Sequence, residues 1–360
     1  CSIIALVFGI ISVPYSSEII AHEHMKIYAY MSIIDVSLKL MNCFLIKNYD
    51  GDRLILFSIL TVVQACLLRI FYGWYCTKKF PDVRYRFHIN WKLLKEMASY
   101  SGWNLVSHTA TMLNMQGVNM LINVYFGVAF NSARGIALTA TSCVQKFVND
   151  FSVAFNPQIT KSYASHEYKY MLDLAFTGIR IIWFLILIFM VPICIEAEQI
   201  LNLWLTDVPP MAVTFLRLSL FETLAMQTGY TLVIMIMATG NIKRYQIEVT
   251  LYGGLVFPLT WISFYLGGPV WLGYVYYIFI YFTLNWVRFK NLKILIPEFS
   301  VKEFFKRIYY PCIKVSLLTF SVPLLMSYFF EPSITRLCII IPSSFIWAIT
   351  IIAIFGLSPT

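Results

Sequence analysis

The feature that most constrains this chain is a series of apolar runs that are long enough to cross a lipid bilayer. The runs are about 17 to 25 residues long, and a helix of that length spans the roughly 30 Å hydrocarbon core. Hydrophobic residues make up 59% of the 360 residues and charged residues only 12%, and the mean hydropathy is +0.72. Because helices satisfy their own backbone hydrogen bonds in lipid, the sequence predicts an all-α, polytopic membrane bundle.

Eleven membrane spans are predicted. They lie at residues 1–17, 27–46, 54–76, 101–126, 132–155, 174–195, 211–238, 249–266, 270–286, 308–329 and 337–357. Pro157 lacks an N–H and disfavours helical geometry at the residue before it, so the span 132–155 is predicted to end there. The chain opens at Cys1 inside an apolar run without a basic segment before it. This is not the pattern of a signal peptide, and we expect the visible start to be the middle of a helix, with an N-terminal part missing.

The basic residues predict the orientation of these spans. Lys and Arg concentrate in the cytoplasmic connections of membrane proteins. One alternate set of connections holds 17 of them: 17–26, 77–97, 157–173, 240–248 and 287–307. The other set holds only 4: 47–53, 127–134, 196–210, 267–269 and 330–336. The first set is therefore predicted to be cytoplasmic. The net charge of +9 follows mostly from this topology, and no nucleic-acid partner is expected.

A short internal repeat relates the two halves of the chain. Residues 21–29, AHEHMKIYA, align without gaps on residues 238–246, ATGNIKRYQ. Three pairs are identical: Ala21 and Ala238, Lys26 and Lys243, and Tyr28 and Tyr245. Each copy joins one predicted span to the next, and the even number of spans between the copies predicts a parallel repeat, an architecture used for alternating access. The alternative is that cytoplasmic connections simply resemble one another.

Several charged residues fall within or at the edges of the predicted spans, where a charge costs roughly 2.5–3.5 kcal/mol. The bases are Lys39, Arg69, Lys146, Arg180, Arg217 and Lys314, and the acids are Asp35, Asp150 and Glu222. The excess of bases predicts a hydrated cavity for an anionic cargo such as a lipid-linked pyrophosphate. The candidate cargo-binding cations are Lys39, Arg69, Lys146 and Arg217, and the three acids are candidate partners or ion-coupling groups. Arg180 and Lys314 lie nearer helix ends and are expected to reach the interface.

Polar residues repeat on the same helix faces as these charges. Asp35 and Lys39 are spaced i,i+4, as are Lys146 and Asp150, so each pair shares one face. In the span 101–126, Asn104 and His108 form one strip, and Gln116 and Asn119 belong to another. We expect these strips to line the cavity. The alternative, which the residues leave open, is that each charged pair is a structural salt bridge and that His108 hydrogen-bonds between helices.

Cysteines and histidines indicate neither disulfides nor a metal site. The eight cysteines lie in or beside apolar runs without paired spacing. His22 and His24 lie close together, but the short connection that holds them offers no further ligands. No metal or other cofactor is expected.

Four segments carry a family resemblance: the segment 13–30 that opens with VPY, the segment 101–137 from SGWNL to NSARGIA, FNPQITKSYA at 155–164 and LNLWLTDVP at 201–209. Together they resemble the polysaccharide-transport branch of the multidrug/oligosaccharidyl-lipid/polysaccharide flippase superfamily, and most of all its lipopolysaccharide O-antigen flippases. The resemblance implies fourteen spans, in two pseudo-symmetric six-helix lobes and two additional C-terminal helices, of which the eleven would be the last. Residues 1–76 would then belong to the N-terminal lobe, 77–97 to the linker, 98–290 to the C-terminal lobe and 291–360 to the additional helices.

The resemblance also implies a function. Such a protein is a transporter rather than an enzyme, and it moves undecaprenyl-pyrophosphate-linked oligosaccharide across the bacterial inner membrane by alternating access. Coupling to H⁺ or Na⁺ is common in the superfamily. The implied partners are the lipid-linked oligosaccharide, membrane lipids and other polysaccharide-assembly proteins.

Two other functions stay open. A multidrug antiporter of the same superfamily would need an acidic, aromatic cavity for organic cations, which the excess of buried bases disfavours. A membrane polysaccharide polymerase or acyltransferase would need a sizeable outer connection or a catalytic cluster of His and acids. The predicted outer connections are short and contain no His.

Overall fold

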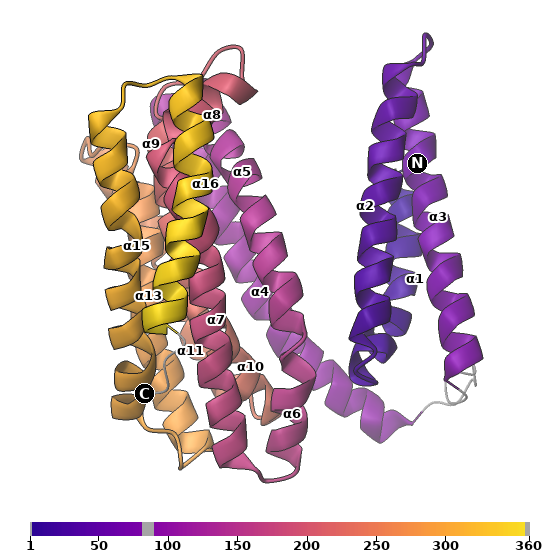
Figure 1. Cartoon of the computed structure of the whole chain (residues 1–360). Helices are drawn as coiled ribbons and strands as arrows, with labels where there is room; N and C mark the ends of the chain where they lie inside the picture. Colours follow the sequence, from indigo (N-terminus) through magenta and orange to yellow (C-terminus); the bar gives the residue numbers. More distant parts are fainter. Residues whose placement is uncertain (1, 81–89, 357–360) are drawn as a thin grey trace. The chain divides into compact units, whose positions relative to one another are not determined.

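The structure, a computed structural model, describes residues 2–80 and 90–356, and in that part of the chain all regular secondary structure is helical. The chain divides into two compact units, Cys1–Asn90 and Trp91–Thr360, which we call unit 1 and unit 2 and describe separately. Unit 1 appears in indigo to purple in Figure 1, and unit 2 takes the remaining colours. The abundance of long apolar helices makes this a multi-pass membrane protein.

Unit 1 consists of three long helices, α1 (Ser2–Ala21), α2 (Met25–Lys47) and α3 (Arg53–Lys79). Asp52 caps α3, because its side chain accepts hydrogen bonds from the backbone N–H groups of Leu54 and Ile55. Both α1 and α2 pack on α3, and a small core of Ile19, Cys76 and Phe80 joins α1 to the end of α3. Most other apolar side chains of these helices are exposed, as expected where the solvent is lipid.

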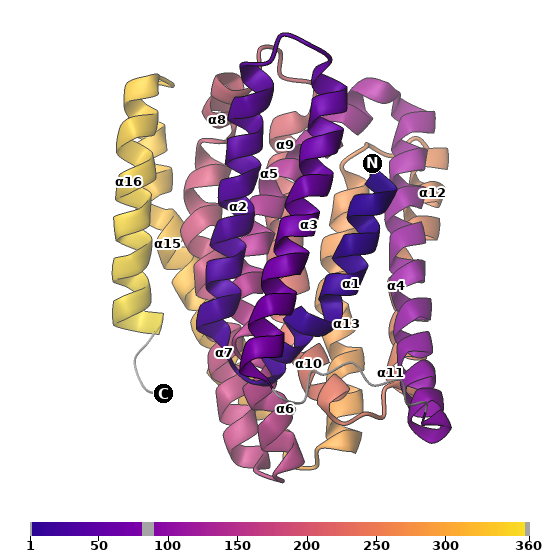
Figure 2. The same ribbon diagram turned by 90° about the vertical axis from the view of Figure 1, so that its right-hand side faces the viewer.

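Unit 2 is built around the central helix α7 (Tyr168–Ile195), which is buried over most of its length. Its other helices are α4 (Trp91–Phe126), α5 (Val128–Val153), α6 (Asn156–Ala164), α8 (Ala197–Trp204), α9 (Ala212–Thr228), α10 (Tyr230–Ala238), α11 (Lys243–Gly253), α12 (Val256–Tyr265), α13 (Leu272–Leu295), α14 (Val301–Phe304), the π-helical turn η1 (Phe305–Tyr309), α15 (Tyr310–Phe329), α16 (Ile334–Ile351) and the π-helical turn η2 (Ile352–Gly356). The helices α5, α9, α15 and α16 pack against α7. At one edge of unit 2 lie α15 and α16, and at the other lie α4 and α12 (Figure 2).

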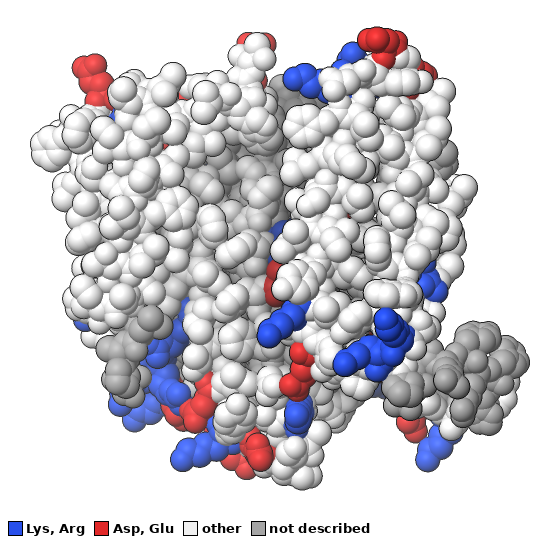
Figure 3. Space-filling view, turned by 45° about the vertical axis from the view of Figure 1, so that its right-hand side comes forward, with Lys and Arg blue, Asp and Glu red and all other residues white. Residues whose placement is uncertain are grey.

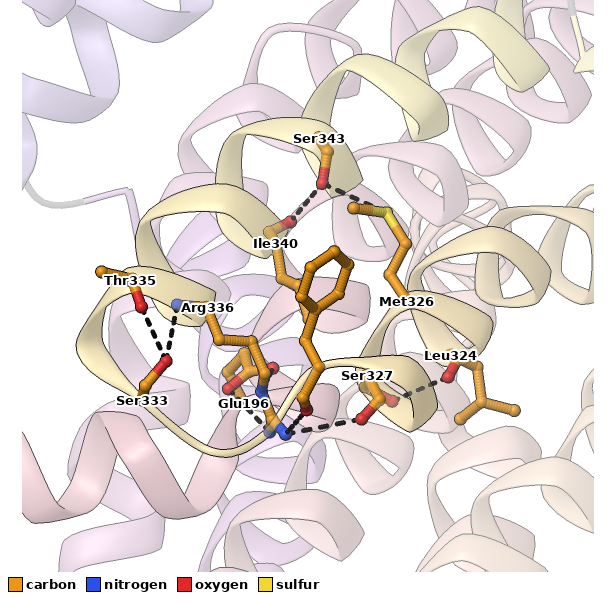
Figure 4. A network of polar contacts seen from close by, with 10 residues as sticks. Glu196, Leu324, Met326, Ser327, Ser333, Thr335, Arg336, Ile340 and Ser343 are labelled. Atoms are coloured by element: carbon orange, nitrogen blue, oxygen red, sulfur yellow. Dashed lines mark hydrogen bonds and ion pairs between the residues drawn. The ribbon is translucent and has the colours of Figure 1, made fainter.

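Two ion pairs, one at each end of α7, join it to the segment that runs from η1 through α15 to α16. Arg336 donates to both carboxylate oxygens of Glu196 at 3.0 and 3.1 Å, and the Glu196 side chain is 0% exposed (Figure 4). At the other end of α7, Arg307 pairs with Asp173 at 2.6 Å. This second end also carries a group of basic residues from α7, α11, α13, α14 and η1, and we call it the basic end: Lys169, Arg244, Lys290, Lys293, Lys302, Lys306 and Arg307. In Figure 3, Lys and Arg of unit 2, on the left, gather at its lower end.

The eleven predicted spans differ in how strongly the structure supports them. Eight helices, or runs of consecutive helices, are long and apolar enough to cross a membrane. They are Ile3–Ala21, Met25–Lys47, Arg53–Lys79, Tyr168–Ile195, Ala212–Ala238, Lys243–Tyr265, Val301–Phe329 and Ile334–Gly356. The other three predicted spans coincide with α4, α5 and α13, which are 36, 26 and 24 residues long but carry more polar and charged side chains. The count of eleven therefore stays a prediction.

Pro157 marks the start of a helix rather than a turn. The predicted span 132–155 ends close to the observed end of α5 at Val153, and α6 begins at Asn156 with Pro157 in its first turn. A proline is favourable there, because its missing N–H would have no helical partner in the first turn.

Candidate functional site

The predicted charges of unit 1 form a chain of hydrogen bonds between α2 and α3. Asp35 pairs with Lys39 at 2.6 Å, and its other carboxylate oxygen accepts from the side-chain amide of Gln64 at 2.7 Å. The Gln64 carbonyl in turn accepts from Asn42 at 3.0 Å. Asp35 thus contacts side chains of both helices, as either a structural pair or a coupling acid could. Lys39 is 58% exposed and keeps its ammonium accessible.

Arg69 is held by an aromatic side chain rather than by an acid. Its guanidinium lies 4.1 Å from the centre of the Tyr15 ring and donates to the Tyr15 hydroxyl at 3.0 Å. Within residues 2–80, no carboxylate forms an ion pair with Arg69. A Cβ atom at Gly73 would lie 2.5 Å from Nη1 of Arg69, so the absence of a side chain there lets the guanidinium lie along α3. Arg69 is therefore a half-buried cation without an acidic partner among the described residues.

The charged pair of α5 behaves differently from that of α2. Lys146 and Asp150 are both exposed, and within the described ranges they do not form a contact ion pair with each other. The adjacent residue Asn149 accepts from Gln227 of α9 at 2.9 Å. Lys146 therefore presents an exposed ammonium on the surface of unit 2, as a cargo-binding cation requires.

The predicted polar strips of α4 separate into bonded and exposed residues. Asn104 accepts from Gln246 of α11 at 2.8 Å, and Asn119 donates to Gln116 at 3.3 Å. His108 and Gln116 are exposed. Asn104 therefore joins α4 to α11, whereas His108 and the side-chain NH₂ of Gln116 are exposed to a ligand or to a neighbouring surface.

Arg217 has a local structural partner. Its Nε donates at 2.9 Å to the backbone carbonyl of Cys194, in the last turn of α7. Carbonyl groups in the last turn of a helix lack intrahelical donors and attract cations. This contact explains why Arg217 does not need Glu222, which is five residues away.

Glu222 instead belongs to a buried cluster that we call the Arg134 cluster: Arg134 of α5, Glu222 of α9, and Tyr274 and Tyr277 of α13. Arg134 is 1% exposed, and its guanidinium lies 4.8 and 5.6 Å from the ring centres of Tyr274 and Tyr277. Glu222 interacts electrostatically with Arg134 without forming a contact ion pair, as far as the described residues show. The cluster thus places a base, an acid and two phenols together inside unit 2.

Several polar atoms of the Arg134 cluster have no hydrogen-bond partner among the described residues. They are Nε and Nη1 of Arg134, Oε2 of Glu222 and the hydroxyl of Tyr274. A buried unpaired polar group costs about 1–3 kcal/mol. A group of such atoms in one place therefore favours the binding of a small polar ligand or the transfer of a proton. Glu222 lies ten residues after Ala212, or roughly 15 Å along α9, which is about half of the hydrocarbon core.

A second buried arginine lies nearer the basic end of α13. Arg288 is 6% exposed, donates to the side-chain oxygen of Asn285 at 2.7 Å and lies 3.4 Å from the hydroxyl of Tyr245. A Cβ atom at Gly229 would lie 1.9 Å from Nη1 of Arg288. The glycine at the junction of α9 and α10 therefore makes room for the guanidinium.

Neither buried arginine is among the predicted site residues. The predicted connections 127–134 and 287–307 contain Arg134 and Arg288, but α5 already begins at Val128 and α13 continues to Leu295. The helical spacing contained a usable signal. Arg134, Ala137 and Thr141 follow an i, i+3, i+7 pattern and are all buried.

The two histidines next to α2 have aromatic partners. His22 stacks on Phe80 at 4.3 Å between ring centres, and His24 hydrogen-bonds the hydroxyl of Tyr75 at 3.0 Å. A search of the described residues finds no group of three or more His, Cys, Asp or Glu that could hold a metal ion.

Comparisons of the chain with protein-family models, with curated proteins and with solved structures gave no match. The family resemblance therefore rests on the four sequence segments.

Proposed function

We propose that the protein is a transporter that carries a lipid-linked, pyrophosphate-bearing oligosaccharide, such as an O-antigen unit, across a bacterial inner membrane by alternating access. Arg69 carries the proposal. It lies ten residues before the end of α3, or roughly 15 Å from that end, and its partner is Tyr15 rather than an acid. An unneutralised guanidinium in a membrane-spanning helix is expensive and is usually retained for binding.

The chemistry of Arg69 and Lys146 suits a phosphate. A guanidinium binds phosphate oxygens through two parallel hydrogen bonds, and the Tyr15 ring holds its plane in place. Lys146 adds an exposed point charge that its neighbour Asp150 does not neutralise by contact. The two residues belong to different units, and each is proposed as a phosphate-binding cation of its own unit.

The turns at the two copies of the repeat support an origin of both units from one ancestral half. Glu23 and Gly240 occupy aligned positions, and both have a left-handed backbone, with φ of 58° and 72°. Each turn follows a helix that ends at the aligned alanines, Ala21 and Ala238. The packing is similar too, because α1 packs on α3 and its counterpart α9–α10 packs on α13. Such parallel repeats are one basis of alternating access.

A multidrug antiporter is the second candidate, and the Arg134 cluster is the observation that favours it. Glu222 with Tyr274 and Tyr277 provides the acidic and aromatic groups that bind organic cations. Arg134 lies in the same cluster and repels a cation, so we place an anionic cargo first. In both readings Glu222 is a candidate for proton or sodium coupling, as are Asp35 and Asp150.

The test is a transport measurement on Arg69→Ala and Lys146→Ala in the full-length protein. We expect each to lower surface display of polysaccharide roughly tenfold or more, because a charge-assisted hydrogen bond contributes about 1.5–3 kcal/mol. Arg69→Lys should retain part of the activity, since it keeps the charge but loses bidentate binding. The matched control is Arg53→Ala at the exposed start of α3.

Membrane insertion, measured by the amount of protein in the membrane fraction, should be the same for all variants. Normal polysaccharide display in both alanine variants would exclude the proposed cargo site. In a second arm, Glu222→Gln should abolish the dependence of transport on a proton or sodium gradient. Energy-dependent efflux of organic cations by the wild type would favour the antiporter instead.

A further inference from the structure

A groove of about 980 Å³ opens on the surface of unit 2 between α7, α9, α13, η1 and α15. Its walls are mainly aromatic and aliphatic, and they include Trp183, Phe221, Phe282, Trp286, Tyr310 and Leu317. Trp286, Tyr310 and Leu317 are strongly exposed. The transport site proposed above uses none of these residues.

The groove extends over only one half of the membrane-spanning length of unit 2. The lining residues of α9 and α13 that lie farthest from the basic end are Phe221 and Phe282. They lie nine and ten residues from the starts of their helices, or roughly 14–15 Å. From there the groove runs toward the basic end, where Lys302 and Lys306 line it. Leu317 lies eleven residues beyond Lys306, or roughly 16 Å, and one bilayer leaflet contributes about 15 Å of hydrocarbon.

The two lysines that line the groove, Lys302 and Lys306, form no ion pair among the described residues. Arg307, in the same segment, is neutralised by Asp173 at 2.6 Å and by Glu303 at 3.0 Å. Lys302 and Lys306 are exposed, spaced i,i+4 and without an acidic partner in the part of the chain that the structure describes. They therefore provide two positive charges at one end of an apolar groove.

The polar atoms in the walls satisfy one another. Trp183 Nε1 donates to the Ser316 hydroxyl at 2.9 Å, and Asn285 donates to the Tyr309 hydroxyl at 2.8 Å. These internal hydrogen bonds leave the groove an apolar surface below the lysines. Such a surface binds hydrocarbon without leaving buried polar groups unpaired.

We infer that this groove binds one anionic glycerophospholipid of the leaflet at the basic end. Its phosphate lies at Lys302 and Lys306, and its acyl chains lie against the aromatic walls. The length of the groove along the helices indicates which kind of lipid fits. An acyl chain is one leaflet long, and the groove ends near the middle of the bilayer. The bound lipid would fill the space between α13 and α15, whatever the cargo of the transporter is.

The test measures binding of phosphatidylglycerol to the purified full-length protein by native mass spectrometry. We expect the wild type to retain one phosphatidylglycerol in preference to phosphatidylcholine. The double variant Lys302→Ala/Lys306→Ala should bind it roughly 30-fold more weakly, from the usual contribution of two lysines near an anionic lipid. The matched control, Lys169→Ala/Lys293→Ala, removes two exposed lysines outside the groove and should bind like the wild type.

A third variant, Leu317→Trp, keeps both lysines and fills the apolar part of the groove, so it should also weaken binding. Gel filtration of each variant reports whether it is folded. Equal binding of phosphatidylglycerol by the wild type and the Lys302/Lys306 variant would overturn the inference. So would undecaprenyl phosphate displacing phosphatidylglycerol at lower concentration, which would assign the groove to the cargo. Loss of lipid binding with normal transport would leave the proposed function intact.

Discussion

At the scale of single residues, the buried Arg288 depends on a glycine in a neighbouring helix. A methyl group at Gly229 would lie 1.9 Å from Nη1 and 2.5 Å from Cζ of Arg288, and 2.7 Å from Oδ1 of Asn285. The backbone of Gly229 is right-handed helical, with φ of −91°, so alanine is acceptable there in every respect except space. The close contacts alone therefore decide the effect of a substitution.

We expect Gly229→Ala to lower the free energy of unfolding by about 1–3 kcal/mol, the usual range for overpacking a buried site. Chemical unfolding of the purified protein in detergent measures the change. Gly102→Ala in α4 is the control, because nothing lies within 4 Å of a Cβ atom there. That variant should be neutral or slightly stabilising, since alanine favours a helix over glycine. Equal stability of the two variants would mean that Arg288 moves aside without cost.

The residue scale also shows what the sequence could and could not predict about the site. Asp35 and Lys39 form the predicted i,i+4 pair, in the favourable order with the acid first. Lys146 and Asp150 have the same spacing in the opposite order and do not pair by contact within the described residues. Arg244 and Glu248 also have the base first, but Lys290 and Asn291 of α13 help to fix that carboxylate. Spacing alone therefore predicts which residues share a face, whereas neighbouring helices decide which of them pair.

At the scale of helices, the ion pair between Glu196 and Arg336 fastens α16 to the end of α7. The side chains are 0% and 12% exposed, and Arg336 also donates to the backbone carbonyl of Phe330 at 3.1 Å. A bidentate pair in this environment leaves a buried charge behind when one partner is removed. The pair therefore determines the position of the hairpin α15–α16, which also forms one wall of the lipid groove.

We expect Arg336→Ala to destabilise the protein by about 3–5 kcal/mol, the range for breaking a buried pair. Arg244→Ala is the control, because Arg244 is 53% exposed in its pair with Glu248 and should cost about 0–1 kcal/mol. Thermal unfolding in detergent measures both. Replacing both partners, as in Glu196→Gln/Arg336→Met, should recover part of the lost stability, because no buried charge then remains. A double variant less stable than Arg336→Ala would contradict this account.

Helix boundaries were harder to predict than helix existence. The predicted spans 101–126 and 270–286 fall on α4 and α13, but α4 begins at Trp91 and α13 ends at Leu295. Hydropathy identifies the part of a helix that lies in hydrocarbon, whereas the helix itself continues into the polar interface on its own backbone hydrogen bonds. This is why Arg288 was assigned to a connection although it is buried inside unit 2.

At the scale of the whole molecule, the helical class and the membrane environment followed from the apolar runs, but the number of crossings did not. Eight segments meet the requirements of length and apolarity, and α4, α5 and α13 are the ones in question. The polar residues of these three helices lower their mean hydropathy. Polar residues of this kind are expected in a transporter whose helices line a cavity. The features that suggest function are therefore the ones that obscure the span count.

The span count can be decided by labelling cysteines with a membrane-impermeant maleimide, after replacement of the natural exposed cysteines Cys43, Cys143 and Cys338. If α4 and α5 both cross the membrane, Val128→Cys is labelled in intact cells. If α13 crosses as well, Glu298→Cys is labelled only after permeabilisation, as expected for the basic end. Two controls do not depend on whether α4 and α5 cross the membrane. Thr206→Cys should be labelled in intact cells, and Ser165→Cys should be labelled only after permeabilisation. Labelling of Glu298→Cys in intact cells would remove α13 from the membrane, and with it one wall of the proposed lipid groove.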